Sequence, residues 1–126
     1  MLQIVALLLL SQQPFEPFTE GIATYYTVES SSTLTASGET MQDDLYTCAM
    51  RDGEFGGYYF IAAENGESVI CRLNDRGPYV KGRVIDLSEA AMRKLHAKAG
   101  MVRVKVYKVG LDLEKFPDLL SLNQSE

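Results

Sequence analysis

Short apolar runs rich in β-branched and aromatic residues recur along most of the chain, and Gly, Pro or polar clusters separate them. Runs of this kind, bounded by turn residues, are typical of β-strands. They predict strands at residues 21–28, 45–50, 58–63, 67–73, 83–87 and 101–109. The polar stretch at 29–44, with Gly38 at a turn, interrupts the series and predicts a long loop.

Two of these patterns also indicate how the strands pair. Asn65-Gly66 stands between the runs at 58–63 and 67–73, and an Asn-Gly pair in that place favours a hairpin. In the last run two sets of residues alternate, with Val102, Val104 and Val106 on one face and Arg103, Lys105 and Tyr107 on the other. Strict alternation predicts a half-buried strand that closes the sheet.

One segment, residues 89–99, has the helical period instead. Its apolar positions share a face with the residue before the cap: Leu87, Ala91, Met92 and Leu95. Ser88 is suited to cap the first turn, and Gly100 is suited to end the helix. Short strands with one late helix predict a mainly β fold, a small six-stranded β-barrel with a helical insertion.

Length and charge limit the class of protein. The chain has 126 residues, which is the size of one domain. Its formal net charge is −5, and residues 1–50 contain six acids and no Lys or Arg. Because an acidic front half disfavours phosphate contacts, we expect no nucleic-acid partner and no docking to an anionic membrane surface.

The cysteines leave two alternatives. Cys48 and Cys71 form one bridge in an exported protein, or they are two buried thiols in a reducing compartment. Their spacing matches no metal motif and the chain has a single His, so we expect no metal and no other cofactor.

The N-terminal segment has two interpretations of equal weight. The apolar run at 4–10 is at the short limit for a signal peptide, and it is too short to span a bilayer. It is alternatively a segment, residues 1–13, that packs on its own domain or on a protein partner. Ser11 stands where a lipidation cysteine would, so we expect that the protein is not a lipoprotein.

Acidic residues in the loops carry the candidate chemistry. Asp75 stands in LNDRGP, where Gly77-Pro78 fixes the backbone, and an Asp held in this way suits general acid or base work. The alternative is an Asp that only shapes the turn by accepting backbone N–H bonds. Asp86 precedes Ser88, and we expect it to complement the helix N-terminus. For Glu39, in a polar loop, solvation is the default.

Other polar and aromatic side chains add less. His96 falls late in the predicted helix, beside Lys94 and Lys98, where we expect an exposed cation and no catalytic role. Four tyrosines pack in the barrel or stack on sugar rings: Tyr25, Tyr26, Tyr58 and Tyr59. Carboxylates and aromatics in a small barrel are the composition of a carbohydrate-handling site.

Four segments, in this order and spacing, strongly resemble the rare lipoprotein A family: GIATYY, TASGE, ENGESVICRLNDRGPYVKGRVIDLSEAAMRKL and GMVRVKVYKV. The resemblance covers residues 20–109, with the segment 1–19 before it and the tail 110–126 after it, where residues 116–122 suggest one more helical turn. It implies a six-stranded double-psi β-barrel, a fold shared with expansins and barwin-like proteins. It also implies a peptidoglycan substrate and lytic transglycosylase activity, which cleaves the MurNAc–GlcNAc bond without water and leaves a 1,6-anhydro end.

The resemblance further assigns roles to residues. Asp75, by its place in NDRGP, is the general acid/base, and Glu39, by its place in TASGE, is its helper in the same cleft. Asn74 and Arg76 flank the acid and orient the glycan, and we add the tyrosines Tyr25 and Tyr26 as substrate-binding residues. One carboxylic acid suffices for this reaction, because the muramic C6 hydroxyl is itself the nucleophile.

The chain also departs from the family pattern. Active members carry a His in a segment like TAAH, whereas this chain reads TCAM, so that Met50 stands in its place. A thioether transfers no proton, which favours the alternative of a non-catalytic, expansin-like module that binds peptidoglycan strands. We also expect the chain to lack the C-terminal peptidoglycan-binding repeat that many members carry. We expect a periplasmic or secreted protein, or a virion-associated bacteriophage component that acts at the cell wall.

Overall fold

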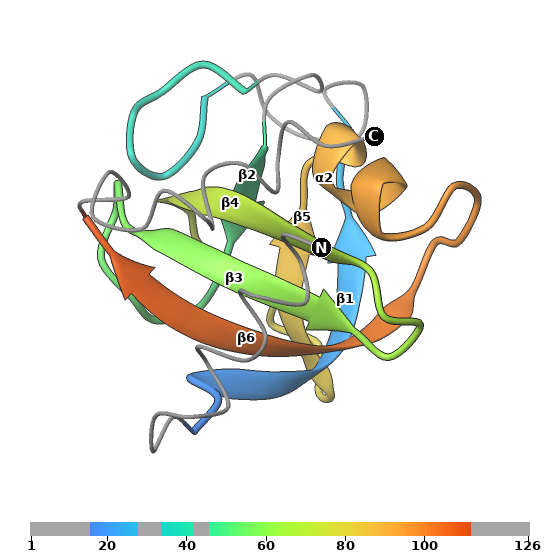
Figure 1. Cartoon of the computed structure of the whole chain (residues 1–126). Coiled ribbons are helices and arrows are strands. Elements are labelled where there is room, and N and C mark those ends of the chain that lie inside the picture. The colour runs from blue at the N-terminus through green and yellow to red at the C-terminus, as the bar shows by residue number, and fades with distance from the viewer. Residues whose placement is uncertain (1–15, 28–33, 42–45, 112–126) are drawn as a thin grey trace.

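A computed structural model describes residues 16–27, 34–41 and 46–111. Its strands are β1 (Thr19–Tyr25), β2 (Thr47–Ala49), β3 (Tyr58–Ala63), β4 (Ser68–Asp75), β5 (Arg83–Leu87) and β6 (Val102–Gly110), with one helix, α2 (Glu89–Leu95) (Figure 1). The strands predicted at 58–63 and 83–87 match β3 and β5 in both bounds. The strand predicted at 67–73 continues to Asp75, so the candidate acid ends β4.

The strands close into the six-stranded barrel that the sequence predicts, and their order around it is β1-β5-β2-β4-β3-β6 (Figure 1). Two pairs, β1 with β5 and β2 with β4, are parallel, and the remaining neighbours are antiparallel. The hairpin predicted at Asn65-Gly66 joins β3 and β4. Parallel neighbours need crossover connections. These connections place the short strand β2 between β4 and β5, the strands that carry Asp75 and Asp86.

Apolar side chains from each of the six strands and from α2 fill the barrel. The alternation predicted for β6 is confirmed: Val102, Val104 and Val106 are buried, whereas Arg103 and Lys105 are exposed. Each large apolar side chain buried in this way stabilises the fold by about 1.5–3 kcal/mol. The core therefore gives the strand ends a rigid frame.

Helix α2 begins as predicted and ends early. Ser88 Oγ accepts the N–H of Ala91 at 3.3 Å, and the predicted apolar face is buried. The helix ends at Leu95 rather than near residue 99, because His96 has an extended backbone. Its Nδ1 accepts the N–H groups of both Lys98 and Ala99 at 3.1 Å, which is a local alternative to helical bonding.

Cys48 and Cys71 are both buried and free, which matches the alternative of two thiols. Among the described residues, no helix is long and apolar enough to cross a membrane. The apolar run at 4–10, the proposed anchor at 1–13 and the predicted turn at 116–122 lie outside the described residues.

Candidate functional site

Two aspartates flank the same residue of the barrel. Ala49, in β2, pairs with Asp75 of β4 on one side and with Asp86 of β5 on the other. The pairing of β2 with β4 shifts register between Cys48 and Ala49, and two strand spacings separate the Asp75 and Asp86 backbones by about 10 Å. The closed barrel therefore brings the two aspartates to either side of Ala49, close enough for the charge of Asp75 to act on Asp86.

Backbone N–H groups fix the orientation of the Asp75 carboxyl group. Its Oδ1 accepts the N–H of Ala36 at 2.8 Å and that of Arg76 at 2.9 Å. Its main-chain oxygen accepts the N–H of Met50 at 3.2 Å, which ties the end of β4 to the end of β2. Because both side-chain bonds go to Oδ1, Oδ2 is the oxygen from which Asp75 can exchange a proton with a ligand.

Asp86 has a role that the sequence prediction missed. It was expected at the helix N-terminus, but Ser88 caps α2, and the Asp86 carboxylate instead accepts the Thr24 hydroxyl at 3.1 Å. Burial raises the pKa of Asp86, and the charge of Asp75 raises it further, against the bond from Thr24 and the charge of Arg83. The signal was available in RVIDL, because alternation sends Ile85 and Leu87 into the core and Asp86 to the opposite face.

Glu39 is held by an arginine of β4. Its carboxylate forms two bonds with the Arg72 guanidinium, at 2.8 and 2.9 Å, and accepts the Asn74 amide at 3.1 Å. The hydrogen bonds from Arg72 lower the pKa of Glu39 below its usual range, although the side chain is 42% exposed. Glu39 is therefore a carboxylate at neutral pH, with no proton to donate.

Asn74 and Arg76 support the loops around Asp75. Asn74 is 3% exposed, and within the described residues its Oδ1 is buried without a hydrogen-bond partner. Arg76 donates to the Gly53 carbonyl at 2.8 Å, and its guanidinium lies over the Phe55 ring at 4.1 Å. Both side chains are thus engaged with the protein itself.

The two tyrosines assigned to substrate are partly or wholly covered. Tyr26 is 5% exposed, and its hydroxyl bonds Thr47 Oγ1 at 2.7 Å, so its ring packs inside the protein. Burial raises the pKa of Tyr26 above its usual range. Tyr25 is half-buried, and the Arg93 guanidinium covers one face of its ring at 4.7 Å.

Met50 lies beside Asp75 through its backbone, while its side chain is 1% exposed and belongs to the core. A hollow of about 250 Å³ adjoins it, lined by Phe18, Thr19, Met50, Arg51, Asp52 and Val84. Neither Asp75 nor Asp86 lines this hollow.

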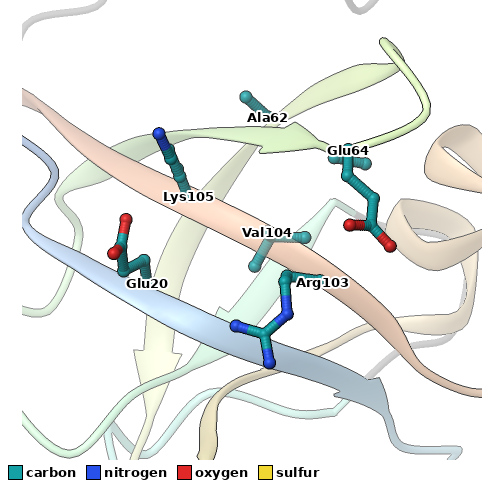
Figure 2. Close-up of a pocket in the computed structure, with 7 residues that line it drawn as sticks. Glu20, Ala62, Glu64, Arg103, Val104 and Lys105 are labelled. Carbon is teal, nitrogen blue, oxygen red and sulfur yellow. The ribbon is translucent and has the colours of Figure 1, made fainter.

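A hollow of about 430 Å³ lies elsewhere on the barrel, over β1, β3 and β6 (Figure 2). Figure 2 shows side chains of both charges around it, from Glu20, Glu64, Arg103 and Lys105. None of the site residues predicted from the sequence lines it. Glu20 and Lys105 are cross-strand partners, so opposite charges already face each other across this surface.

The closed six-stranded barrel, with its two parallel strand pairs, defines the class, a double-psi β-barrel protein. A family model described as "Lytic transglycolase" matches residues 19–106, and the chain belongs to this family. The resemblance in sequence to rare lipoprotein A proteins is confirmed.

The curated relatives are peptidoglycan enzymes by name. The chain is 40% identical to the "Endolytic peptidoglycan transglycosylase RlpA" of Pasteurella multocida, over 74% of this chain and 32% of that protein. It is 46% identical to the protein of the same name from Pseudomonas aeruginosa, over 68% and 26%. The chain therefore spans about a quarter to a third of the length of these relatives.

Solved structures show the same fold at low identity. An expansin of Clavibacter michiganensis superposes with a TM-score of 0.54 at 24% identity, over 72% of this chain and 50% of that one. The Streptomyces papain inhibitor superposes with a TM-score of 0.57 at 22% identity, over 72% and 93%. These likenesses confirm the fold.

Proposed function

We propose that this protein is a peptidoglycan lytic transglycosylase that cleaves the MurNAc–GlcNAc bond to a 1,6-anhydro product, with Asp75 as the general acid/base. The observation that carries the proposal is the pair of carboxyl groups that flank Ala49, of which Asp75 is oriented by two backbone N–H groups. The names and the identity of the relatives support the substrate.

A single proton, carried on Asp75 Oδ2, serves both steps of the proposed reaction. The protonated Oδ2 gives its proton to the glycosidic oxygen as the bond from that oxygen to the muramic C1 breaks. The resulting carboxylate then takes the proton of the C6 hydroxyl as O6 bonds to C1. Asp75 is thereby returned to its protonated form, and the reaction uses no water and no second nucleophile.

Asp86 is the second carboxyl group of the site. Burial is the largest cause of its raised pKa, and the charge of Asp75 adds to it. Repulsion of this kind makes the ionisation of both groups less favourable than the ionisation of one. Asn74 and Arg76 act on the substrate indirectly, by holding the loops that frame Asp75.

Digestion of purified sacculi tests the proposal, with mass spectrometry of 1,6-anhydromuramic ends as the readout. We expect the wild type to release them and Asp75→Asn to lower the rate by about 10²–10⁴-fold. Asp52→Asn, at an exposed position near the site, is the matched control and is expected to keep the wild-type rate. Loss of activity in Asp86→Asn with retention in Asp75→Asn would transfer the acid role to Asp86.

A second candidate function is that of a non-catalytic module that grips peptidoglycan strands. Met50, a side chain without an exchangeable proton, favours it. Both proteins, wild type and Asp75→Asn, would then sediment with sacculi and release no anhydro ends. Because peptidoglycan lies outside the cytoplasm, we propose that the protein acts in the periplasm, as a secreted protein or on a virion. The intact mass of the mature protein tests whether residues 1–13 are removed or remain for a protein partner.

A further inference from the structure

A short loop covers the end of β4 and reaches the proposed acid. The 34–40 loop, closed by the bridge between Leu34 and Thr40, is tightened by bonds between Thr35 and Glu39. Ser37 N–H donates to the Asn74 carbonyl at 3.1 Å, and Ala36 N–H donates to Asp75 Oδ1 at 2.8 Å. The last of these bonds is one of the two that orient the Asp75 carboxyl group.

An ion pair holds the other end of the same loop. Glu39 is joined to Arg72 by two bonds, and Glu39 Oε1 also accepts the Asn74 amide. Arg72 and Asn74 alternate with the buried Leu73, so both stand on the face of β4 over which the loop lies. A planar guanidinium that makes two bonds to one carboxylate fixes both distance and angle, which a single contact does not.

We propose that the pair of Arg72 and Glu39 is a clamp that positions Asp75, because it fixes the 34–40 loop at the point from which Ala36 N–H reaches Oδ1. Glu39 and Arg72 are positioning residues, and Glu39 transfers no proton. The role rests on the proposed function of Asp75, but the clamp itself has a structural readout that needs no turnover.

Both carboxylate oxygens of Glu39 accept hydrogen bonds, which fits a positioning residue better than a second acid. Arg72 Nη1 and Nη2 each take one oxygen, so a proton on either would break a charged hydrogen bond. The low pKa of Glu39 agrees with this geometry. A loop that is displaced by about 1 Å would misplace the acid, and displacements of that size cost catalysis up to about a hundredfold.

Glu39→Gln and Arg72→Lys test the clamp, with Glu64→Gln and Arg103→Lys as matched controls on the far hollow. We expect each test variant to lower kcat by about tenfold to a hundredfold with little change in KM. The double variant is expected to lose no more than either single one, because both substitutions break the same contact. The pH–rate profile of Glu39→Gln is expected to keep the shape of the wild-type profile, and the loss of a limb that the wild type shows would make Glu39 an acid/base and overturn the clamp.

Amide hydrogen exchange of Ala36, followed by NMR, is the readout without turnover. We expect exchange about tenfold faster in Glu39→Gln and in Arg72→Lys than in the wild type and the controls. Unchanged exchange at Ala36 overturns the clamp, whatever the rates are. If the wild type releases no anhydro ends, the proposed function fails, and the exchange data alone then decide whether the clamp holds the loop on Asp75.

Discussion

Asp75 and Asp86 stand on opposite sides of Ala49, each as its cross-strand partner, although eleven positions of chain separate them. The charge of one acts on the other, because Asp75 raises the pKa of Asp86 in addition to the larger effect of burial. A carboxyl group that is half-buried and faces a like charge is less stable as an anion than it is in the unfolded chain. Such groups are typical of sites that move protons.

Asp86 is expected to reduce the stability of the fold at neutral pH. Since its folded pKa lies above its unfolded value, the folded protein binds more protons in between, and stability falls as the pH rises through that window. Asp86→Asn removes the cost, so its Tm at pH 7 should exceed that of the wild type by about 2 °C or more. Thermal unfolding at pH 4 and pH 7 checks this: a lower Tm for the variant at pH 7 contradicts it.

Much of the fold could be predicted because its signals are local. The alternation through β6 and the Asn65-Gly66 turn each depend on a few neighbouring residues, and both hold in the structure. The end of α2 could not be predicted in the same way. His96 Nδ1 accepts two backbone N–H groups, and these bonds replace the hydrogen bonds of a further helical turn. Gly100, from which the helix end was predicted, carries no information about these bonds.

The site was predictable only in part, because its partners meet through the barrel. Asp75 was predicted from its own loop. The contact between Arg72 and Glu39 joins residues 33 apart, and Asp86 comes close to Asp75 only because β2 lies between their strands. Local patterns carry no information on which strand separates β4 from β5, so Arg72 was not predicted and Asp86 was assigned to the helix.

The ion pair of Glu39 and Arg72 is expected to contribute stability only above the acid range. The folded pKa of Glu39 is depressed, so its contribution is complete above the unfolded value near 4.5 and is lost as the pH falls through the folded value. Because the carboxylate is 42% exposed, the pair contributes about 0.5–1 kcal/mol. Urea unfolding should show Glu39→Gln less stable than the wild type at pH 7 and equal to it at pH 2. A difference that persists at pH 2 would rule out the ion pair as its cause.

Gly53 is expected to tolerate no side chain. Its φ is +104°, and an added Cβ would lie 2.5 Å from Tyr59 Oη and 2.9 Å from Leu73 Cδ2. Gly66 has a similar φ of +92° but open space around it, so Gly66→Ala measures the cost of backbone conformation alone, about 1–2 kcal/mol. Gly53→Ala should be destabilised by about 1–3 kcal/mol more. The Gly53 carbonyl also accepts a hydrogen bond from Arg76, so a shift of this turn would disturb that contact. Equal stabilities of Gly53→Ala and Gly66→Ala would mean that the turn around Gly53 rearranges at little cost to make room for the added Cβ.

Met50 stands where the resemblance in sequence leads us to expect a histidine, and the burial of its side chain determines what a replacement costs. The side chain is 1% exposed among apolar neighbours. Met50→Leu conserves volume and should cost less than about 1.5 kcal/mol. Met50→His buries a polar ring and should cost about 1–3 kcal/mol more unless the ring turns toward the neighbouring hollow of about 250 Å³.

Denaturant unfolding measures the loss of stability in Met50→Leu and Met50→His, and the release of anhydro ends measures any gain in activity. If Met50→His is stable and faster than Met50→Leu, the imidazole has reached the hollow and acts beside Asp75. If it is unstable and no faster, the imidazole stays in the core and transfers no proton beside Asp75.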